Sequence, residues 1–207
     1  MSEISQAWAE LMSELDSRAP ASRADIRPGN SGGADLVERE LGISLSGELR
    51  EWFSLHDASG LRFDTVLLPE AVIMSPREAA DDSRMIRDIW AENDAEWDGG
   101  QERDTENSAG QVAHTWLPEY VMVGSDGCGG GLFVDTRSGP QQGCVRWWDK
   151  TEADDDYGDG PIASSLSQLL RAVLASVRSG RPVVHGLAAR IRDERLEWAP
   201  ADDARPL

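Results

Sequence analysis

Residues 116–136 read W-L-P-E-Y-V-M-V-G-S-D-G-C-G-G-G-L-F-V-D-T, and residues 143–148 read G-C-V-R-W-W. Short apolar runs occupy 120–123, 132–135 and 144–148. A glycine-rich turn separates the first two runs and a polar turn separates the last two. Strand, glycine loop, strand, turn and strand together predict a β-meander. Glycines this dense indicate backbone that turns sharply or lies close to another surface.

Outside the meander, apolar residues recur mainly at helical spacing. This spacing predicts helices at 4–15, 34–41, 46–56, 75–90, 166–177 and 187–198, with a Pro/Ser/Gly-rich linker at 19–33 and a strand at 63–68. Several ends carry local signals: Gly42 follows the second helix, and Ser75 with Glu78 forms a capping box. We therefore predict an α+β fold, in which a mostly antiparallel central sheet is packed by several helices.

The order of motifs resembles the SUKH superfamily. L-G-I-S-L (41–45) and E-L-R-E-W-F-S-L-H-D (48–57) precede the meander, and S-S-L-S-Q-L-L (164–170) follows it. The resemblance spans residues 36–177. It departs from the family pattern at Leu45-Ser46, where Leu-Pro is usual, and at residues 57–60, where Asn-Gly or Asp-Gly is usual.

The resemblance implies a SUKH-like α+β domain at 34–180, preceded by an N-terminal amphipathic helix at 1–18. A C-terminal helix and tail would follow at 181–207. It also implies a non-catalytic protein-binding domain. In bacteria such a domain is an immunity protein that captures a secreted toxin domain, often a nuclease. The alternative is a regulatory interaction module like the fungal cell-wall-assembly regulator, with no toxin partner.

Charge limits the partner. Asp and Glu total 38 against 20 Lys and Arg, so the formal net charge is −18. This charge repels nucleic acid and anionic membrane surfaces, whereas it attracts a basic protein. Simple solubility explains the same composition. We expect a cytoplasmic protein, because the N-terminus lacks the basic start and apolar block of a signal peptide. The sequence leaves the oligomeric state open.

The candidate partner-binding residues follow from the tryptophans and carboxylates. Trp147 and Trp148 are neighbours in one strand and must point to opposite faces, so one of them can look outward, unless both are covered. Acidic residues lie near by in sequence, and an aromatic anchor beside carboxylates suits a basic partner. The predicted set is Asp126, Trp147, Trp148, Asp149, Asp154, Asp155, Asp156 and Trp97. Trp97, in an acidic loop at 92–106, either anchors that loop or contacts the partner.

Catalytic patterns are missing from the sequence. The histidines at 56, 114 and 185 are far apart, neither cysteine has metal-ligand spacing, and the glycine loop leads into a strand rather than a helix. We therefore predict no enzyme activity, no cofactor, no metal and no disulfide between Cys128 and Cys144. An enzyme acting on a cationic or sugar substrate is the remaining alternative, since no carboxylate pair stands out among so many.

Overall fold

The predicted meander forms the central sheet of the computed structural model, which describes residues 1–59, 66–96, 105–154 and 160–201. Its strands are β4 (Tyr120–Ser125), β5 (Gly131–Asp135) and β6 (Val145–Trp148), and β3 (Val72–Ile73) forms the edge beside β4. All neighbours are antiparallel in the order β3-β4-β5-β6. Every residue of β5 is buried, because other elements cover both faces of the sheet.

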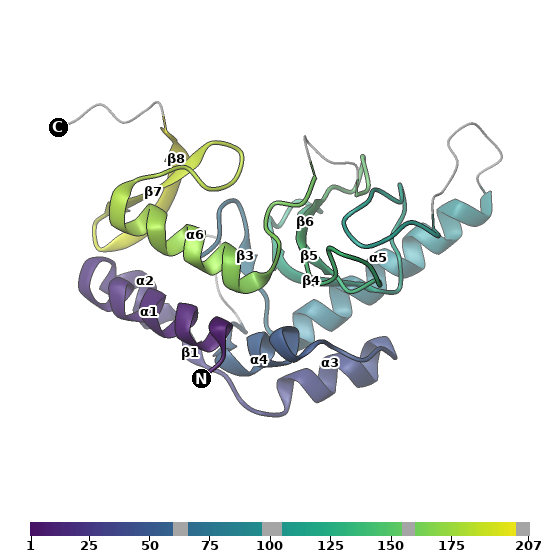
Figure 1. Cartoon of the computed structure of the whole chain (residues 1–207), viewed down its shortest axis with the longest axis horizontal. Helices are drawn as coiled ribbons and strands as arrows, with labels where there is room; N and C mark the ends of the chain where they lie inside the picture. The colour runs from purple at the N-terminus through teal and green to yellow at the C-terminus, as the bar shows by residue number, and fades with distance from the viewer. Residues whose placement is uncertain (60–65, 97–104, 155–159, 202–207) are drawn as a thin grey trace.

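The described part of the chain also contains six helices. They are α1 (Glu3–Arg18), α2 (Pro20–Asp25), α3 (Gly33–Leu41), α4 (Gly47–Leu55), α5 (Pro76–Glu96) and α6 (Leu166–Ser179). Figure 1 shows α1 and α6 side by side in one half of the molecule, while α5 runs past β4 in the other half. This arrangement confirms the predicted α+β class. None of the described helices combines the length and apolarity needed to cross a membrane.

Several helix ends lie where local sequence signals predict them. At α5, Ser75 Oγ accepts from the Glu78 backbone N–H at 3.3 Å, and Glu78 Oε2 accepts from the Ser75 backbone N–H at 2.9 Å. This reciprocal pair is the predicted capping box. Gly42 ends α3 in the left-handed conformation, with φ 71°. These caps satisfy backbone groups that a helix end would otherwise leave without partners.

The N-terminal half of the core contains a buried histidine. Trp8 from α1 and Trp52 from α4 pack against the His56 ring at centroid distances of 5.3 and 4.5 Å. His56 begins β2 (His56–Asp57), which pairs with β1 (Arg27–Pro28). Neither ring nitrogen of His56 has a hydrogen-bond partner within the described residues. Burial lowers the pKa of His56 from 6.5 to about 4, so the ring is neutral at pH 7.

The predicted C-terminal helix at 187–198 is wrong. This segment forms an antiparallel hairpin of β7 (Leu187–Arg192) and β8 (Arg195–Pro200). Asp193 and Glu194 make the two-residue turn, with φ of 48° and 62°. Positive φ at both positions defines the hairpin turn that fits strand twist, but Asn-Gly or Asp-Gly is its usual sequence. Asp-Glu gives no such signal. The order of apolar and polar residues in 187–200 is as compatible with a helix as with two strands.

Two other expectations need correction. The segment 19–33 is not simply a linker, because it contains α2 and β1. The acidic loop predicted at 92–106 begins later than expected, since α5 continues to Glu96. Half of the strand predicted at 63–68 lies outside the described residues, and the described half, 66–68, contributes one isolated bridge at Leu68. The domain boundaries at 18, 34 and 180 remain predictions.

Candidate functional site

The glycine loop between β4 and β5 is organised by one carboxylate. Asp126 Oδ1 accepts hydrogen bonds from the backbone N–H groups of Cys128 and Gly130, at 2.7 and 2.9 Å. Gly129 adopts φ 103°, a conformation that side chains disfavour. The loop therefore has a fixed shape, and it separates two hollows on the surface of the domain.

The first hollow has a volume of about 530 Å³ and combines an indole with carboxylates. Glu70, Asp126, Cys128, Trp147, Asp149 and His185 line it, and we call it the acidic hollow. Asp126, Trp147 and Asp149 belong to the predicted set, and the fold brings these three together. Hydrogen bonds from Thr151 lower the pKa of Asp149 and hold its carboxylate in the charged form.

Glu70 and His185 were not predicted for this site. His185 Nδ1 lies 2.6 Å from Glu70 Oε2, and the His185 ring meets the Trp147 ring at 5.8 Å with an interplanar angle of 76°. Both residues have positive φ, 61° at Glu70 and 48° at His185. They are 115 positions apart in sequence and lie in turns without a shared motif. No local signal could have paired them.

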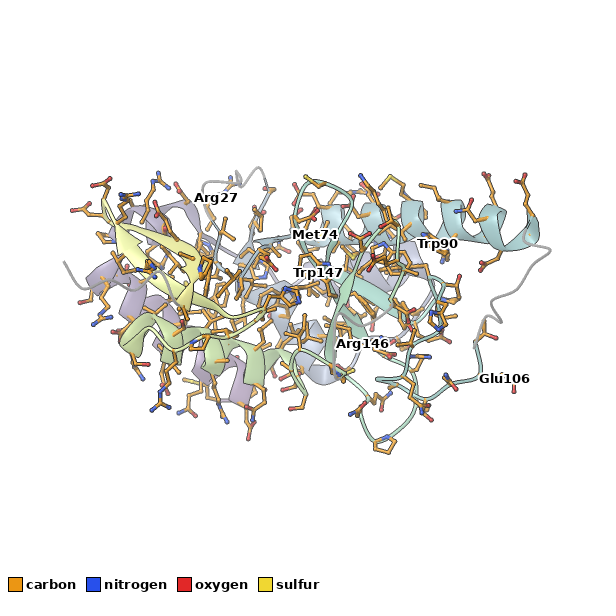
Figure 2. The ribbon with its side chains drawn as sticks, turned by 90° about the horizontal axis from the view of Figure 1, so that it is seen from above. Arg27, Met74, Trp90, Glu106, Arg146 and Trp147 are labelled. Atoms are coloured by element: carbon orange, nitrogen blue, oxygen red, sulfur yellow. The ribbon has the colours of Figure 1, made fainter. Side chains whose placement is uncertain are left out.

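The two adjacent tryptophans have opposite environments, as alternation in β6 requires. Trp148 is 1% exposed and packs edge-to-face against Trp90 and Trp116, at 5.2 and 4.8 Å. Trp147 is only partly buried and lies on the opposite face of the sheet, toward the acidic hollow. Figure 2 shows Trp147 near the middle of the molecule and Trp90 on α5. Trp147 is thus the outward member of the pair, and Trp148 is a core residue.

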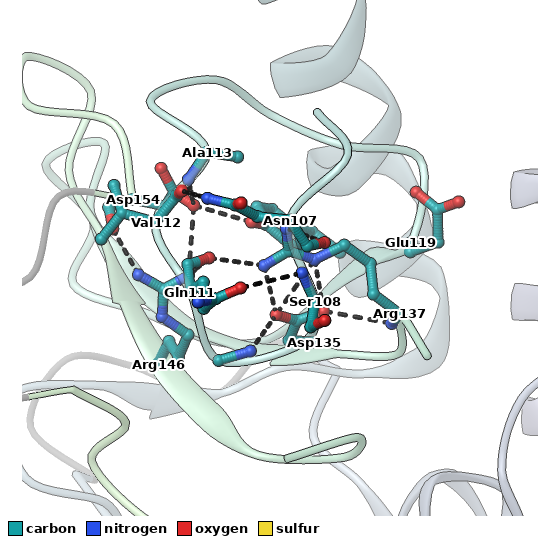
Figure 3. A network of polar contacts seen from close by, with 12 residues as sticks. Asn107, Ser108, Gln111, Val112, Ala113, Glu119, Asp135, Arg137, Arg146 and Asp154 are labelled. Carbon is teal, nitrogen blue, oxygen red and sulfur yellow. Dashed lines mark hydrogen bonds and ion pairs between the residues drawn. The ribbon is translucent and has the colours of Figure 1, made fainter. Parts of the chain in front are cut away.

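Asp154 is not a surface residue, which corrects its predicted place in the binding surface. Its carboxylate is fully buried and accepts from the Ala113 backbone N–H, the Tyr120 hydroxyl and Arg146, at 2.8, 2.7 and 3.1 Å. Figure 3 shows Asp154 with Ala113 and Arg146, together with the Asp135–Arg137 ion pair. The sequence predicted Asp154 to be exposed because it begins an acidic run. Its contacts with Arg146 and Tyr120 bury it instead. Burial beside Asp154 also raises the pKa of Tyr120, which therefore stays protonated as a donor.

The remaining predicted residues, Trp97, Asp155 and Asp156, lie outside the described residues. Within the described part, no three His, Cys, Asp or Glu side chains gather in a way that could hold a metal ion. Cys128 is exposed and Cys144 is buried, and no disulfide joins these two described residues.

The second hollow lies on the other side of the glycine loop. Its volume is about 260 Å³, and α5 forms one wall. Met85, Ile86, Ile89 and Trp90 contribute that wall, and Met122, Trp148 and Gly130 also line the hollow. We call this the apolar groove. Ile86, Ile89 and Trp90 belong to the helix predicted at 75–90, but nothing in the sequence indicates that their side of the helix is uncovered.

The arrangement of an antiparallel sheet and helices agrees with a comparison against family models. The SMI1 / KNR4 family (SUKH-1) model matches residues 20–172. The chain belongs to the SMI1 / KNR4 family (SUKH-1). The match covers well over half of the chain. It includes the central sheet and every residue that lines the acidic hollow except His185. SUKH-1 proteins are protein-interaction domains. A search of curated proteins found no match.

Proposed function

We propose that this SUKH-1 protein is a non-catalytic immunity protein that captures a basic toxin domain. The observation that carries the proposal is the acidic hollow. It places the partly buried Trp147 among the carboxylates of Glu70, Asp126 and Asp149, and neither lysine nor arginine is among its described lining residues. An aromatic anchor with complementary charge around it is the composition of a protein-binding centre.

The two components have different kinetic roles. The carboxylates attract a cationic surface and raise the association rate, in keeping with a formal net charge of −18. The indole of Trp147 fills a space on the partner and lowers the dissociation rate. Because the glycine loop carries Asp126 without bulky side chains beside it, a partner can approach the backbone there. Capture would be stoichiometric, with carboxylates occupying a basic cleft that serves a nuclease for nucleic acid.

The test begins with the genes beside this one, because a toxin gene there would favour the immunity role. A toxin domain encoded there is then co-expressed with this protein. The wild-type protein should restore growth and form a stoichiometric complex with the toxin. Asp126→Asn/Asp149→Asn should slow association, because the amides keep the shape but lose the charge. Trp147→Ala should speed dissociation, by a factor equivalent to about 2 kcal/mol if Trp147 is a binding hot spot.

The matched control is Glu3→Gln/Asp16→Asn on α1, which removes the same charge from two exposed positions elsewhere. If this control lowers binding as much as Asp126→Asn/Asp149→Asn, net charge matters and the acidic hollow is not the site. If no toxin domain is encoded beside this gene, or if the wild-type protein neither binds nor neutralises the one encoded there, the immunity assignment fails. The regulatory role would then be preferred.

A further inference from the structure

The C-terminal part of α5 presents an apolar face that the rest of the described chain does not bury. The fully buried residues of this 21-residue helix are Ala79, Ala80 and Ser83, all in its N-terminal part. Beyond them, Met85 and Ile89 are 53% and 49% exposed. A helix normally gains most of its stability by packing its apolar stripe against another element. Here the stripe lines the apolar groove instead.

The spacing of the stripe gives the groove a direction. Asp82, Met85, Ile86, Ile89, Trp90 and Asn93 recur at intervals of three or four and therefore lie on one side of α5. Asp82 and Asn93 are thus the polar ends of an apolar row about three turns long. Trp148 and Met122, which belong to the central sheet, also line the groove. This is the form of a groove that accepts a row of apolar side chains from an extended or helical segment.

The charges around the groove select its occupant. From Asp88 to the end of α5 the helix has four acidic residues and no basic one, and its last turn lacks the basic residue that would offset the negative helix end. Burial and the carboxylates of Glu78 and Asp81 raise the pKa of Asp82, so a cation placed there would relieve local repulsion. The cation among the described lining residues is Lys150, whose Nζ donates to the Cys128 carbonyl at 2.7 Å.

A second copy of this chain fits poorly. Two copies that met along α5 would place seven acidic and three basic residues of one helix against the same set on the other. Two of the three arginines, Arg77 and Arg84, are already paired with Glu40 and Asp81 on the α3 side. Like charges directly opposed across an interface disfavour association.

We propose that the apolar groove docks a cationic amphipathic segment of a partner protein, with its apolar row against Met85, Ile89 and Trp90 and its basic residues beside Asp82 and the acidic end of α5. The groove is a separate surface from the acidic hollow, and the glycine loop lies between them. The proposal rests on the proposed function only in that both require a protein partner.

The probe is a synthetic Leu/Lys peptide about four turns long, with its leucines on one helical face. A peptide of the same composition with scattered leucines controls for charge, and a Leu/Glu peptide controls for apolarity. We expect the amphipathic Leu/Lys peptide to bind at least about tenfold more tightly than either control, and to shift the indole N–H signal of Trp90 in NMR spectra.

Met85→Gln/Ile89→Gln removes the apolar row without adding charge. It should weaken binding of the Leu/Lys peptide about tenfold, whereas Ile191→Gln, at an exposed apolar position on β7, should not. Asp126→Asn/Asp149→Asn should leave peptide binding at the groove intact, which separates failure here from failure of the acidic hollow. The Trp90 signal of the wild-type protein reports docking even if a variant misfolds.

Three results would overturn the proposal. The scattered peptide or the Leu/Glu peptide binds as tightly as the amphipathic Leu/Lys peptide. The Trp90 signal does not move at saturation, or Met85→Gln/Ile89→Gln binds like the wild type. Sedimentation shows a dimer of the protein that Met85→Gln/Ile89→Gln dissociates, which would make a second copy the occupant.

Discussion

Arg146 and Asp154 form an ion pair in which neither side chain has any exposed surface, with 3.1 Å between Nη1 and Oδ2. Arg146 Nη2 also donates to the Asp154 carbonyl at 2.6 Å. The pair fastens the segment after β6 onto the sheet and connects it to the 105–116 segment through the Gln111 carbonyl. The carboxylate of Asp154, at the start of an acidic run, is therefore buried in the core.

Removing that carboxylate should destabilise the fold. Asp154→Ala leaves the Arg146 guanidinium buried without its counter-ion, at a cost of about 3–5 kcal/mol in the free energy of unfolding. Urea denaturation measures the loss. Asp149→Asn, which changes a carboxylate in the acidic hollow, should cost only about 0.5 kcal/mol. Equal losses for the two variants would contradict the structural role assigned to Asp154.

The free energy of unfolding should decrease as the pH is lowered, because of His56. The pKa of His56 is about 4 in the folded protein and 6.5 in an unfolded chain, so the unfolded state binds the proton first as pH falls. The stabilisation is complete above pH 6.5 and is lost progressively down to about pH 4, by roughly 3 kcal/mol in total. His56→Phe should flatten this part of the curve, because it removes the titrating group. The phenylalanine ring still fills the space between Trp8 and Trp52, so the variant should fold.

The slope of His56→Phe is compared with that of the wild-type protein over the same range, pH 6.5 to 4. A wild-type slope in His56→Phe would assign the pH dependence to other groups.

Gly131 should tolerate no side chain. A Cβ at Gly131 would lie 2.2 Å from the Gly124 carbonyl oxygen, which is backbone of the neighbouring strand and cannot move aside. Gly131→Ala should cost about 2–3 kcal/mol through overpacking. Gly143→Ala meets no atom within 4 Å, and only its φ of 88° opposes the change, so its cost should be about 1 kcal/mol. Thermal unfolding of both variants checks the order.

The β7–β8 turn should accept a stabilising change. Asp193→Asn/Glu194→Gly supplies the residues that prefer positive φ at both turn positions. We expect a gain of about 0.5–1 kcal/mol, measured by urea denaturation. A loss of stability would argue that the Asp193 or Glu194 side chain makes a contact worth more than the turn conformation.

Association with a basic partner should depend on salt. Screening shortens the reach of the acidic hollow to about 10 Å at 0.1 M ionic strength. The association rate should therefore fall between low and physiological salt, while the dissociation rate changes little. Stopped-flow measurements with the captured toxin domain test this. A rate indifferent to salt would remove electrostatic steering from the mechanism.

Local signals explain what sequence reading predicted correctly. Ser75 with Glu78, Gly42, and the alternation around Trp147 each specify structure within a few residues. The burial and pairing of a side chain could not be predicted where they depend on residues distant in sequence. Asp154 is drawn inward by Arg146 and Tyr120, and Glu70 meets His185 only after the whole chain has folded. The Asp193–Glu194 turn was missed for another reason, because its residues contradict its conformation.

The adjacent tryptophans of β6 have a consequence for folding fidelity. If β6 slipped by one residue along β5, Trp147 would take the place of Trp148 and the Arg146 side chain would turn to the opposite face. Asp154 would then be buried with no cation, although an indole would still occupy the core position. The Arg146–Asp154 pair, and not the packing of the two indoles, therefore penalises this misaligned pairing of the last strand of the meander.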